Sequence, residues 1–539
     1  MTRYIFVTGG VVSSLGKGIT AASIGRLLKA HGLSVNIVKC DPYINVDAGT
    51  MAPLQHGEVF VTDDGAETDL DLGYYERFLE LNTARANNMT AGQIYQTVIA
   101  KEREGLYLGQ TVQVIPHITN EIKKRFYQAG EGFDITIIEI GGTVGDIESL
   151  PFLEAARQMR PDRTRTDVMY IHVTLVPYLS ASDELKTKPT QHSVNKLREI
   201  GIDPDIIVCR TEKPLGKEIR NKIALFTSVP EEAVIEAPNC FSIYAVPNVL
   251  KKQGIDEQIM MLLRLRSKKW DFEEWTAFVE KLKAAETARA VRIAIAGKYI
   301  RLKDSYKSLA EAIHHGAIAN GVRMELDFVD VEEHDCAARL AKASGIIVPG
   351  GFGDRGIEGK INAVRYAREN GVPFLGICLG MQCAVIEFAR GVLGYKKAHS
   401  TEFAPKTGYP VVALMAEQKD VGGKGGTMRL GASPCRIKPG SLAAKIYGKA
   451  VISERHRHRY EFNPRYLKAY EKNGMTVSGL YREKRLPEIV ELKDHPWFVG
   501  VQFHPELKSR PLAPHPLFRE FVAAAARHKV PADAEAVRA

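Results

Sequence analysis

Short apolar runs alternate with helix-length segments through the first 250 residues of the chain. β-branched residues dominate these runs, which is typical of buried strands. Strands that alternate with helices pair in parallel, so the pattern predicts a parallel sheet covered by helices. The expected strands are Tyr4–Thr8, Ser34–Lys39, Asp134–Ile140, Met169–Leu175 and Asp205–Cys209.

The strand pattern stops between about Lys251 and Arg289, where the sequence becomes charged and helical. We place a helical linker at 267–289, between a first domain at 1–266 and a second at 290–530. Residues 531–539 carry too little apolar surface to pack and are expected to form a loose tail. A second alternation in the later domain predicts the strands Val291–Ala296, Met324–Asp330, Gly345–Val348, Phe374–Ile377 and Phe498–Phe503.

The predicted fold class is therefore α/β, with two doubly wound domains and mainly parallel sheets. The length of 539 residues and the 45% hydrophobic composition agree with at least two cores, since single cores stop growing near 250–300 residues. No apolar run reaches the roughly 18–20 residues that a membrane span needs, so no membrane association is expected.

The cysteines and the net charge indicate the cellular compartment and the kind of ligand. The seven cysteines are scattered and show no paired metal-ligand spacing, which fits a reducing, cytoplasmic environment. The formal charge of +9 is spread along the chain without a basic block. Polyanionic nucleotides would suit it as ligands, and nucleic acid is not expected, although charge alone does not decide.

A glycine-rich loop follows the first expected strand and precedes a helical stretch. It runs from Gly9 to Thr20 and contains Lys17. Backbone N–H groups of such a loop converge on phosphate oxygens, and the lysine reaches the β/γ bridge. The spacing is a lengthened variant, with Val11 where a glycine is usual and Gly18 where Ser or Thr is usual. The alternative is a tight turn with an exposed lysine.

A phosphate loop without its metal-binding hydroxyl needs carboxylates to hold Mg²⁺. Asp71 lies in Asp69–Gly73, and Glu139 lies near the end of an apolar strand, just before two glycines. Ligands of open parallel sheets collect outside the carboxyl ends of the strands, where both Lys17 and Glu139 would lie. The Asp69–Gly73 segment and Glu139 are therefore the two places expected to supply metal ligands.

The second domain contains a strand, then Gly376-Ile377-Cys378-Leu379-Gly380, then a helix. This order predicts a nucleophile elbow, whose sharp turn exposes the Cys378 thiol at a helix N-terminus. His504 is the expected base and Glu506 the residue that orients it. The loop Pro349–Gly353 follows another strand and could offer backbone N–H groups to an oxyanion. Cys383, on the next helix, is expected to be an inert core residue.

These residues resemble the triad class of glutamine amidotransferases, which hydrolyse glutamine to glutamate and ammonia. An arginine and a carboxylate are what a zwitterionic amino acid requires. On composition alone, the His456–Arg459 run could instead be a metal cluster or a polar edge strand. The resemblance implies that glutamine is held by Gly351, Leu379, Gly380, Met381, Gln382, Glu402 and Arg459.

The first half resembles the CTP synthase family in blocks that occur in the family's order, and the resemblance spans nearly the whole chain. They are FVTGGVVSSLGKGI, CDPYINVD, GAETDLDLG, VQVIPHITNEI, EIGGTVGDIES and KTKPTQHSV. The resemblance implies an ATP-dependent carbon–nitrogen ligase that aminates UTP to CTP with ammonia cut from L-glutamine. It also implies a UTP intermediate phosphorylated at O4.

The same resemblance assigns nucleotide contacts. ATP would be held by Ser14, Leu15, Gly16, Lys17, Gly18, Ile19, Lys39 and Asp71, with Mg²⁺ on Asp71 and Glu139. UTP would be held by Ser13, Lys186, Thr187, Lys188, Pro189, Thr190, Gln191 and Lys222, and the feedback inhibitor CTP also by Asp146, Ile147 and Glu148.

GTP activation of glutamine hydrolysis is implied as well, with contacts at Arg355, Gly356, Thr427 and Arg429. The stretch from Glu417 to Gly426 looks shorter than the lid of many relatives. The family assembles as homotetramers, as dimers of dimers. Ammonia must reach its acceptor sheltered from water, and the resemblance places Pro53, His56 and Val59 near the mouth of the passage.

Two other functions remain compatible with parts of the sequence. One is another amidotransferase-coupled ligase, such as a cobyric-acid-type synthase, although KTKPTQHSV with GDIES suits a nucleotide acceptor. The other is a nucleotide switch or filament-forming scaffold with a spent glutaminase, against which Cys378, His504 and Glu506 argue.

Overall fold

The computed structural model describes residues 2–52, 57–164, 166–298, 303–351, 355–414 and 428–530. The chain divides into two compact units. Unit 1 comprises Met1–Ala48 and Asp71–Val279, and unit 2 comprises Gly49–Leu70 and Glu280–Ala539. A stretch from the first predicted domain therefore belongs to the unit that contains the second.

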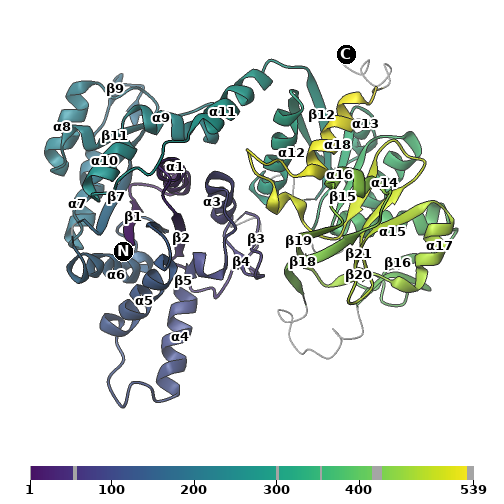
Figure 1. The fold of residues 1–539 in the computed structure, drawn as a ribbon, viewed down its shortest axis with the longest axis horizontal. Helices are drawn as coiled ribbons and strands as arrows, with labels where there is room; N and C mark the ends of the chain where they lie inside the picture. The colour runs from purple at the N-terminus through teal and green to yellow at the C-terminus, as the bar shows by residue number, and fades with distance from the viewer. Residues whose placement is uncertain are drawn as a thin grey trace. The chain divides into compact units, whose positions relative to one another are not determined.

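The core of unit 1 is a parallel sheet of seven strands within the described residues, in the order β11-β10-β7-β1-β6-β2-β5 (Figure 1). The central strands are buried along nearly their whole length, as expected for a parallel sheet covered on both faces. The strands are β1 (Arg3–Gly9), β2 (Val35–Asp41), β5 (Asn88–Thr90), β6 (Ile135–Ile140), β7 (Val168–Leu175), β10 (Ile206–Thr211) and β11 (Val234–Pro238).

Helices connect these strands, and a small hairpin, β8 (Tyr178–Leu179) with β9 (Glu184–Leu185), precedes α7. The helices are α1 (Lys17–Ala30), α3 (Asp71–Leu79), α4 (Ala91–Arg103), α5 (Thr119–Gly130), α6 (Leu150–Asp162), α7 (Lys188–Glu199), α8 (Lys217–Thr227), α9 (Val246–Lys252), α10 (Ile255–Leu262) and α11 (Glu273–Ala285).

The α/β prediction is confirmed, and the five strands expected in the first half are present as β1, β2, β6, β7 and β10. The edge strands β5 and β11 were not predicted. β5 has the sequence Asn-Met-Thr, and β11 is interrupted by Glu236 and ends at Pro238, so neither shows an apolar run.

Unit 2 is built on a sheet of nine strands among the described residues, in the order β13-β12-β14-β15-β23-β22-β21-β18-β19. The five strands predicted for this half pair in parallel, and four antiparallel strands extend them. Its strands are β12 (Ala290–Gly297), β13 (Arg323–Asp330), β14 (Gly345–Val348), β15 (Phe374–Ile377), β18 (Arg429–Ile437), β19 (Val451–His458), β21 (Met475–Tyr481), β22 (Leu486–Leu492) and β23 (Phe498–Val501).

Two smaller sheets and several helices complete unit 2. The sheets join β3 (Phe60–Val61) with β4 (Glu67–Thr68), and β16 (Ala398–Ser400) with β17 (Tyr409–Leu414) and β20 (Tyr460–Phe462). The helices are α12 (Lys307–Ala319), α13 (Cys336–Ala341), α14 (Ile357–Asn370), α15 (Leu379–Gly391), α16 (Leu442–Tyr447), α17 (Leu467–Lys472) and α18 (Pro516–Arg527).

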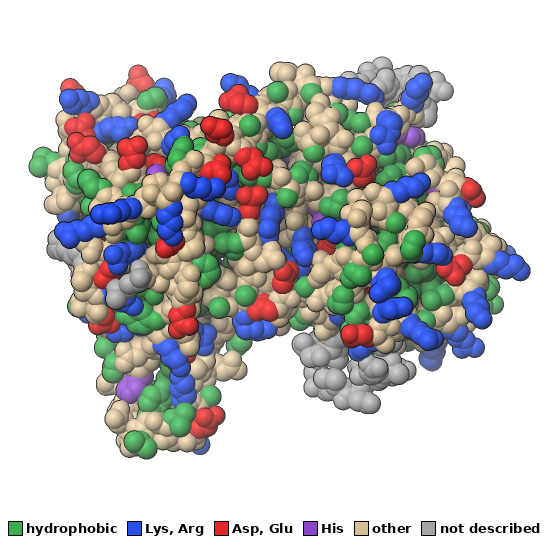
Figure 2. Space-filling model, viewed as in Figure 1, with side chains coloured by type: hydrophobic (Ala, Val, Ile, Leu, Met, Phe, Trp, Pro, Cys, Tyr) green, Lys and Arg blue, Asp and Glu red, His purple; other side chains and the backbone are tan. Residues whose placement is uncertain are grey.

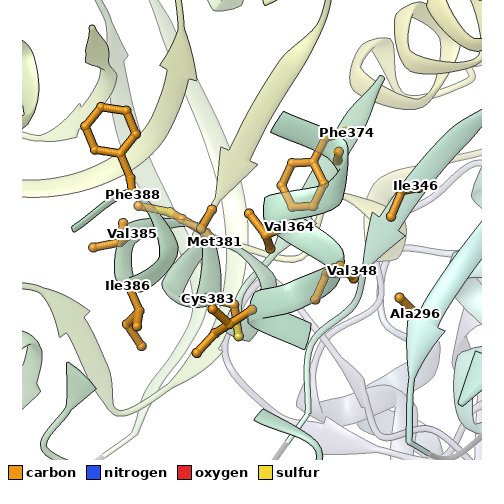
Figure 3. Close-up of a cluster of buried hydrophobic side chains, with 14 of the residues drawn as sticks. Ala296, Ile346, Val348, Val364, Phe374, Met381, Cys383, Val385, Ile386 and Phe388 are labelled. Atoms are coloured by element: carbon orange, nitrogen blue, oxygen red, sulfur yellow. The ribbon is translucent and has the colours of Figure 1, made fainter. Parts of the chain in front are cut away.

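Helix α15 is buried on nearly every side and fixes the core of unit 2. Figure 3 shows part of the apolar cluster around it, where Met381, Val385 and Phe388 of α15 lie among side chains that include Val364 and Phe374. Cys383 is also fully buried in this cluster, as predicted for an inert core residue. Because α15 starts directly after Cys378, this packing holds the expected nucleophile in place.

The division between the units falls inside α11, which lies within the predicted linker. This segment also packs: Trp275 is fully buried and donates from Nε1 to the Tyr244 carbonyl at 3.0 Å. The domain boundaries drawn from the sequence stay predictions, and the predicted tail at 531–539 lies outside the described residues.

In the part of the chain that the structure describes, no helix is both long and apolar enough to cross a membrane. Figure 2 shows Lys and Arg side chains spread over the visible face, with Asp and Glu among them. The positive net charge is therefore not gathered into one basic patch on that face.

Candidate active sites

The loop between β1 and α1 contains several residues with a positive φ. Val11 adopts φ 81° and Gly16 φ 88°. A positive φ is rare for a β-branched residue, so Val11 holds a conformation usually left to glycine, at the position where the sequence departs from the common motif. Ser13 and Ser14 are exposed at the tip of the loop.

Lys17 begins α1 and points across the sheet. Its Nζ donates to the Gly142 carbonyl, just beyond the end of β6, at 2.7 Å. Burial lowers the pKa of the Lys17 ammonium, with Lys39 adding to the effect and Glu139 opposing it. The amine therefore lies over the carboxyl ends of the strands, as the sequence predicted.

Three further charged groups meet at this edge of the sheet. Lys39 and Glu139 are partners in the parallel β2–β6 register, with Nζ and Oε1 3.4 Å apart. The Lys39 ammonium also contacts Asp71, and the Tyr75 hydroxyl donates to Glu139. Burial raises the pKa of Glu139, which Lys39 opposes. The structure thus brings Lys17, Lys39, Asp71 and Glu139 together.

The absence of a side chain at Gly18 leaves room for the Asp71 and Glu139 carboxylates beside α1. An added Cβ at this position would lie 2.8 Å from Asp71 Oδ1 and 3.3 Å from Glu139 Oε2. The side chain that most phosphate loops place here would occupy the space that Asp71 fills. Among the described residues no group of three or more His, Cys, Asp or Glu is arranged for a metal. Two carboxylates nevertheless fit Mg²⁺, which usually takes one or two plus substrate phosphates.

Six of the residues expected to hold UTP, Lys186 to Gln191, lie at the start of α7. Thr187, Thr190 and Gln191 are buried, and the Thr190 hydroxyl donates to the Leu175 carbonyl at 3.0 Å. Lys186 pairs with Glu184 beside the helix start. Lys188 and Pro189 form the first turn of α7, and Lys222 is exposed on α8.

The residues expected to contact the regulators are more scattered. Asp146, Ile147 and Glu148 are exposed after β6, and Arg355 is exposed beside Gly356 at the start of α14, where it pairs with Glu332 at 2.7 Å. Arg429 is largely buried, with Nη1 2.6 Å from Glu488 Oε1 and 3.6 Å from Glu461 Oε1. Thr427, the lid stretch Glu417–Gly426, Pro53 and His56 lie outside the described residues.

Cys378 sits on a strained turn between β15 and α15. Its φ is 53° and its ψ −104°, a combination that costs about 1–3 kcal/mol for a residue with a side chain. Its N–H donates to the Val501 carbonyl at 2.7 Å. An added Cβ on Gly380 would lie 1.9 Å from the Val348 carbonyl oxygen, so only glycine fits beside the nucleophile. The predicted elbow is present.

His504 and Glu506 follow β23, the neighbour of β15. His504 Nδ1 and Glu506 Oε1 are 2.7 Å apart, and the His504 N–H donates to the Arg455 carbonyl. Burial lowers the pKa of His504, but Glu506 and Cys378 outweigh it and raise the pKa to about 10. The imidazole is therefore protonated near neutral pH, which suits a thiolate–imidazolium pair.

A cavity of about 380 Å³ opens over these three side chains within unit 2. Gly350, Gly351 and Arg459 also line it. An added Cβ on Gly350 would lie 2.8 Å from His504 Cε1, so the expected oxyanion loop packs directly on the triad, although Phe352 and Gly353 of that loop lie outside the described residues.

Of the other residues expected to hold glutamine, Met381 points into the core. Gln382 donates to the Tyr460 carbonyl at 2.9 Å and Leu379 starts α15. Burial raises the pKa of Glu402, which the nearby Arg459 opposes.

Comparison with known proteins agrees with this two-site layout. Residues 3–265 match the family described as "CTP synthase N-terminus", and residues 301–524 match "Glutamine amidotransferase class-I". The chain is 59% identical to a CTP synthase of Caldanaerobacter subterraneus subsp. tengcongensis over 535 residues, which is 98% of this chain and 99% of that one. A CTP synthase of Geobacillus kaustophilus is also 59% identical, over 97% of this chain and 99% of that one.

The chain belongs to the CTP synthase family. It is therefore an enzyme, a carbon–nitrogen ligase with an amidotransferase half. A solved Trypanosoma brucei CTPS glutaminase domain with bound acivicin is 39% identical, covering 45% of this chain and 96% of that one at a TM-score of 0.42.

Sequence reasoning missed two buried groups near these sites. The Lys360 ammonium on α14 is fully buried with no hydrogen bond to another described residue, and an added Cβ on Gly351 would lie 3.4 Å from it. Burial lowers its pKa to about 8. His172 lies behind Gly10, between Thr8 at 2.8 Å and Ser193 at 2.7 Å, and burial lowers its pKa to about 3. Neither residue stands in a motif that marks it.

The Gly18 geometry predicts the effect of a side chain there. Gly18→Ser should lower ammonia-dependent CTP formation by about 100-fold, because a misplacement of about 1 Å at a catalytic group can cost that much. Glutamine hydrolysis should be unchanged. The control is Gly216→Ala in the same unit, since an added Cβ at Gly216 meets nothing within 4 Å. Equal activity of the two variants would contradict the packing argument.

The His504–Glu506 pair predicts a pH effect. The His504 imidazolium should persist until the pH nears its raised pKa of about 10 and be lost above it. Glu506→Gln removes a charge that raises this pKa, so the alkaline limb of kcat/KM for glutamine hydrolysis should move to lower pH by about one unit or more. An unmoved alkaline limb would show that Glu506 does not set the protonation of His504.

Proposed function

We propose that the chain converts UTP to CTP with ATP and L-glutamine, through a UTP intermediate phosphorylated at O4. The observation that carries the proposal is that one chain of the CTP synthase family has Cys378, His504 and Glu506 around one cavity and a lysine–carboxylate cluster after its glycine-rich loop. Hydrolysis of the amide would supply the ammonia that the phosphorylated pyrimidine accepts.

In the glutaminase half, the Cys378 thiolate attacks the side-chain amide carbon of glutamine. His504 then gives its proton to the departing ammonia and later takes one from the water that releases glutamate. Glu506 would keep the imidazole oriented, and backbone N–H groups of the Gly350–Gly351 loop, which borders the cavity, would stabilise the oxyanion. Arg459 and Glu402 would hold the charged ends of the amino acid.

In the synthetase half, Lys17 and Lys39 would offset the charge that grows on the transferred phosphoryl group. Asp71 and Glu139 would hold Mg²⁺, which supplies further charge neutralisation when bound. Ser14 to Ile19 form the phosphate loop for ATP. Ser13, the start of α7 from Lys186 to Gln191, and Lys222 would hold UTP, because the lysines suit its phosphates and the helix start adds partial positive charge.

Regulation by GTP and CTP is part of the proposal. Exposed Asp146, Ile147 and Glu148 are available to bind CTP, and exposed Arg355 beside Gly356 is available to bind GTP. Arg429 forms an ion pair with the buried Glu488. Any effect of Arg429 on GTP activation would therefore involve this ion pair.

We also propose a cytoplasmic homotetramer, a dimer of dimers. Exposed apolar side chains gather on α4 and the chain that follows it: Ile99 is 57% exposed, Leu106 60% and Leu108 90%. In Figure 2, hydrophobic side chains lie at the lower end of the region that Figure 1 labels α4. Such a patch on a soluble chain marks an interface, which supports assembly.

The first test is CTP formation from UTP, ATP, Mg²⁺ and glutamine, followed by chromatography. Cys378→Ala should lower glutamine-dependent synthesis by about 1000-fold or more, since it removes the nucleophile, and leave ammonia-dependent synthesis intact. The matched control is Cys383→Ala, which changes a buried cysteine of the next helix.

Two outcomes would contradict the proposal in different ways. No CTP from the unsubstituted chain, even with ammonia supplied, would mean that UTP is not the acceptor. An equal loss of glutamine-dependent and ammonia-dependent CTP synthesis in Cys378→Ala would mean that Cys378 is not limited to glutamine hydrolysis.

A further inference from the structure

A hairpin from the N-terminal half of the sequence is built into the glutaminase unit. We call residues 57–70, which contain β3 and β4, the docked hairpin. Asp63 Oδ1 lies 2.6 Å from Arg455 Nε, and Glu67 Oε1 lies 2.7 Å from Arg457 Nε. Both arginines belong to β19 at the edge of the large sheet.

Alternation along β19 separates two sets of side chains. Arg455 and Arg457 face the docked hairpin, whereas His456 and His458 face the buried carboxylates Glu488 and Glu461. The Arg455 side chain is fully buried, and its guanidinium lies 5.3 Å from the centre of the Phe60 ring. A buried cation left without its carboxylate is strongly unfavourable, so the pair of Arg455 with Asp63 favours this position of the hairpin.

The backbones of the hairpin and β18 also touch. The Ala432 N–H donates to the Asp63 carbonyl at 2.8 Å. Gly431 has φ 84°, and an added Cβ there would lie 2.6 Å from the Gly65 nitrogen. A side chain at position 431 would therefore push the hairpin away.

The docked hairpin forms part of the wall of the glutaminase cavity. Glu58 and Val59 line the same 380 Å³ cavity as Cys378. Glu58 is held in turn by the Ser308 N–H, at 2.9 and 3.0 Å from its two oxygens. The carbonyl of Arg457 is 3.9 Å from the Cys378 sulfur, so the strand that binds the hairpin also borders the nucleophile.

The hairpin is continuous with the synthetase site. Leu70, its last residue, is followed directly by Asp71, which starts α3 and contacts Lys39. The docked hairpin therefore lines the cavity where ammonia would be released, and it is followed directly by Asp71, which is proposed to bind Mg²⁺ at the nucleotide site.

We propose that Arg455 and Arg457 are positioning residues that hold the docked hairpin over Cys378, so that released ammonia is kept from solvent on its way to the synthetase site. This inference rests on the proposed function. Its specific content is that the two ion pairs, rather than the apolar contacts alone, keep the cavity wall closed.

The test measures glutamate and CTP formed by the same enzyme at saturating glutamine, ATP, UTP and GTP. In the unsubstituted chain their ratio should be about one. Arg457→Gln and Glu67→Gln should each raise it about threefold, because either change removes the ion pair that holds the docked hairpin on β19. The ratio of glutamate to CTP in the double variant should not exceed that of the more affected single variant, because both substitutions remove the same ion pair.

Arg436→Gln is the matched control, because Arg436 is exposed on β18 outside this contact, and its ratio should stay near one. Ammonia-dependent CTP formation should be unchanged in every variant. A glutamate-to-CTP ratio near one in both single variants would overturn the inference. A parallel loss of ammonia-dependent CTP synthesis would also overturn it, because it would mean that Arg457 and Glu67 have a purely structural role. Absence of CTP from the unsubstituted chain with ammonia would instead refute the proposed function.

Discussion

Both sites depend on the turn from a parallel strand into the helix that follows it. In unit 1 this turn joins β1 to α1 and places Lys17 on the first helical residue; in unit 2 it joins β15 to α15 and places Cys378 just before the helix. Each turn needs glycine where a Cβ would collide, at Gly18 and at Gly380. The helix start then supplies partial positive charge to a phosphate in one site and to a thiolate in the other.

Residues that follow neighbouring strands complete each site. Glu139 on β6 meets Lys39 on β2, and His504 after β23 lines the same cavity as Cys378 after β15. The docked hairpin adds a connection of another kind, because the chain leaves the synthetase sheet after β2, contributes a wall to the glutaminase cavity and returns at Asp71. The chain therefore passes between the two units at the docked hairpin as well as at α11.

Much of this arrangement could be predicted from sequence because it is local. The buried strands, the phosphate loop and the elbow are each encoded within about ten residues, and strand order at a sheet edge brings Glu139 toward Lys17. The antiparallel strand β18 was missed because one of its faces is polar and its apolar period is broken. For β19, a polar edge strand was one of the alternatives that the His456–Arg459 run left open. The pairs Asp63–Arg455 and Glu67–Arg457 join residues about 390 positions apart, and Lys360 has no neighbouring motif, so only the folded chain reveals them.

The central claim is that nitrogen freed at Cys378 is used by the synthetase site of the same enzyme. It is tested most directly by supplying glutamine labelled with ¹⁵N at its amide together with unlabelled ammonium, and then measuring the isotope in CTP by mass spectrometry. The account predicts that the amino nitrogen of CTP carries the glutamine label well beyond its share of the mixed ammonia in solution. A label content equal to that of the mixed pool would contradict it.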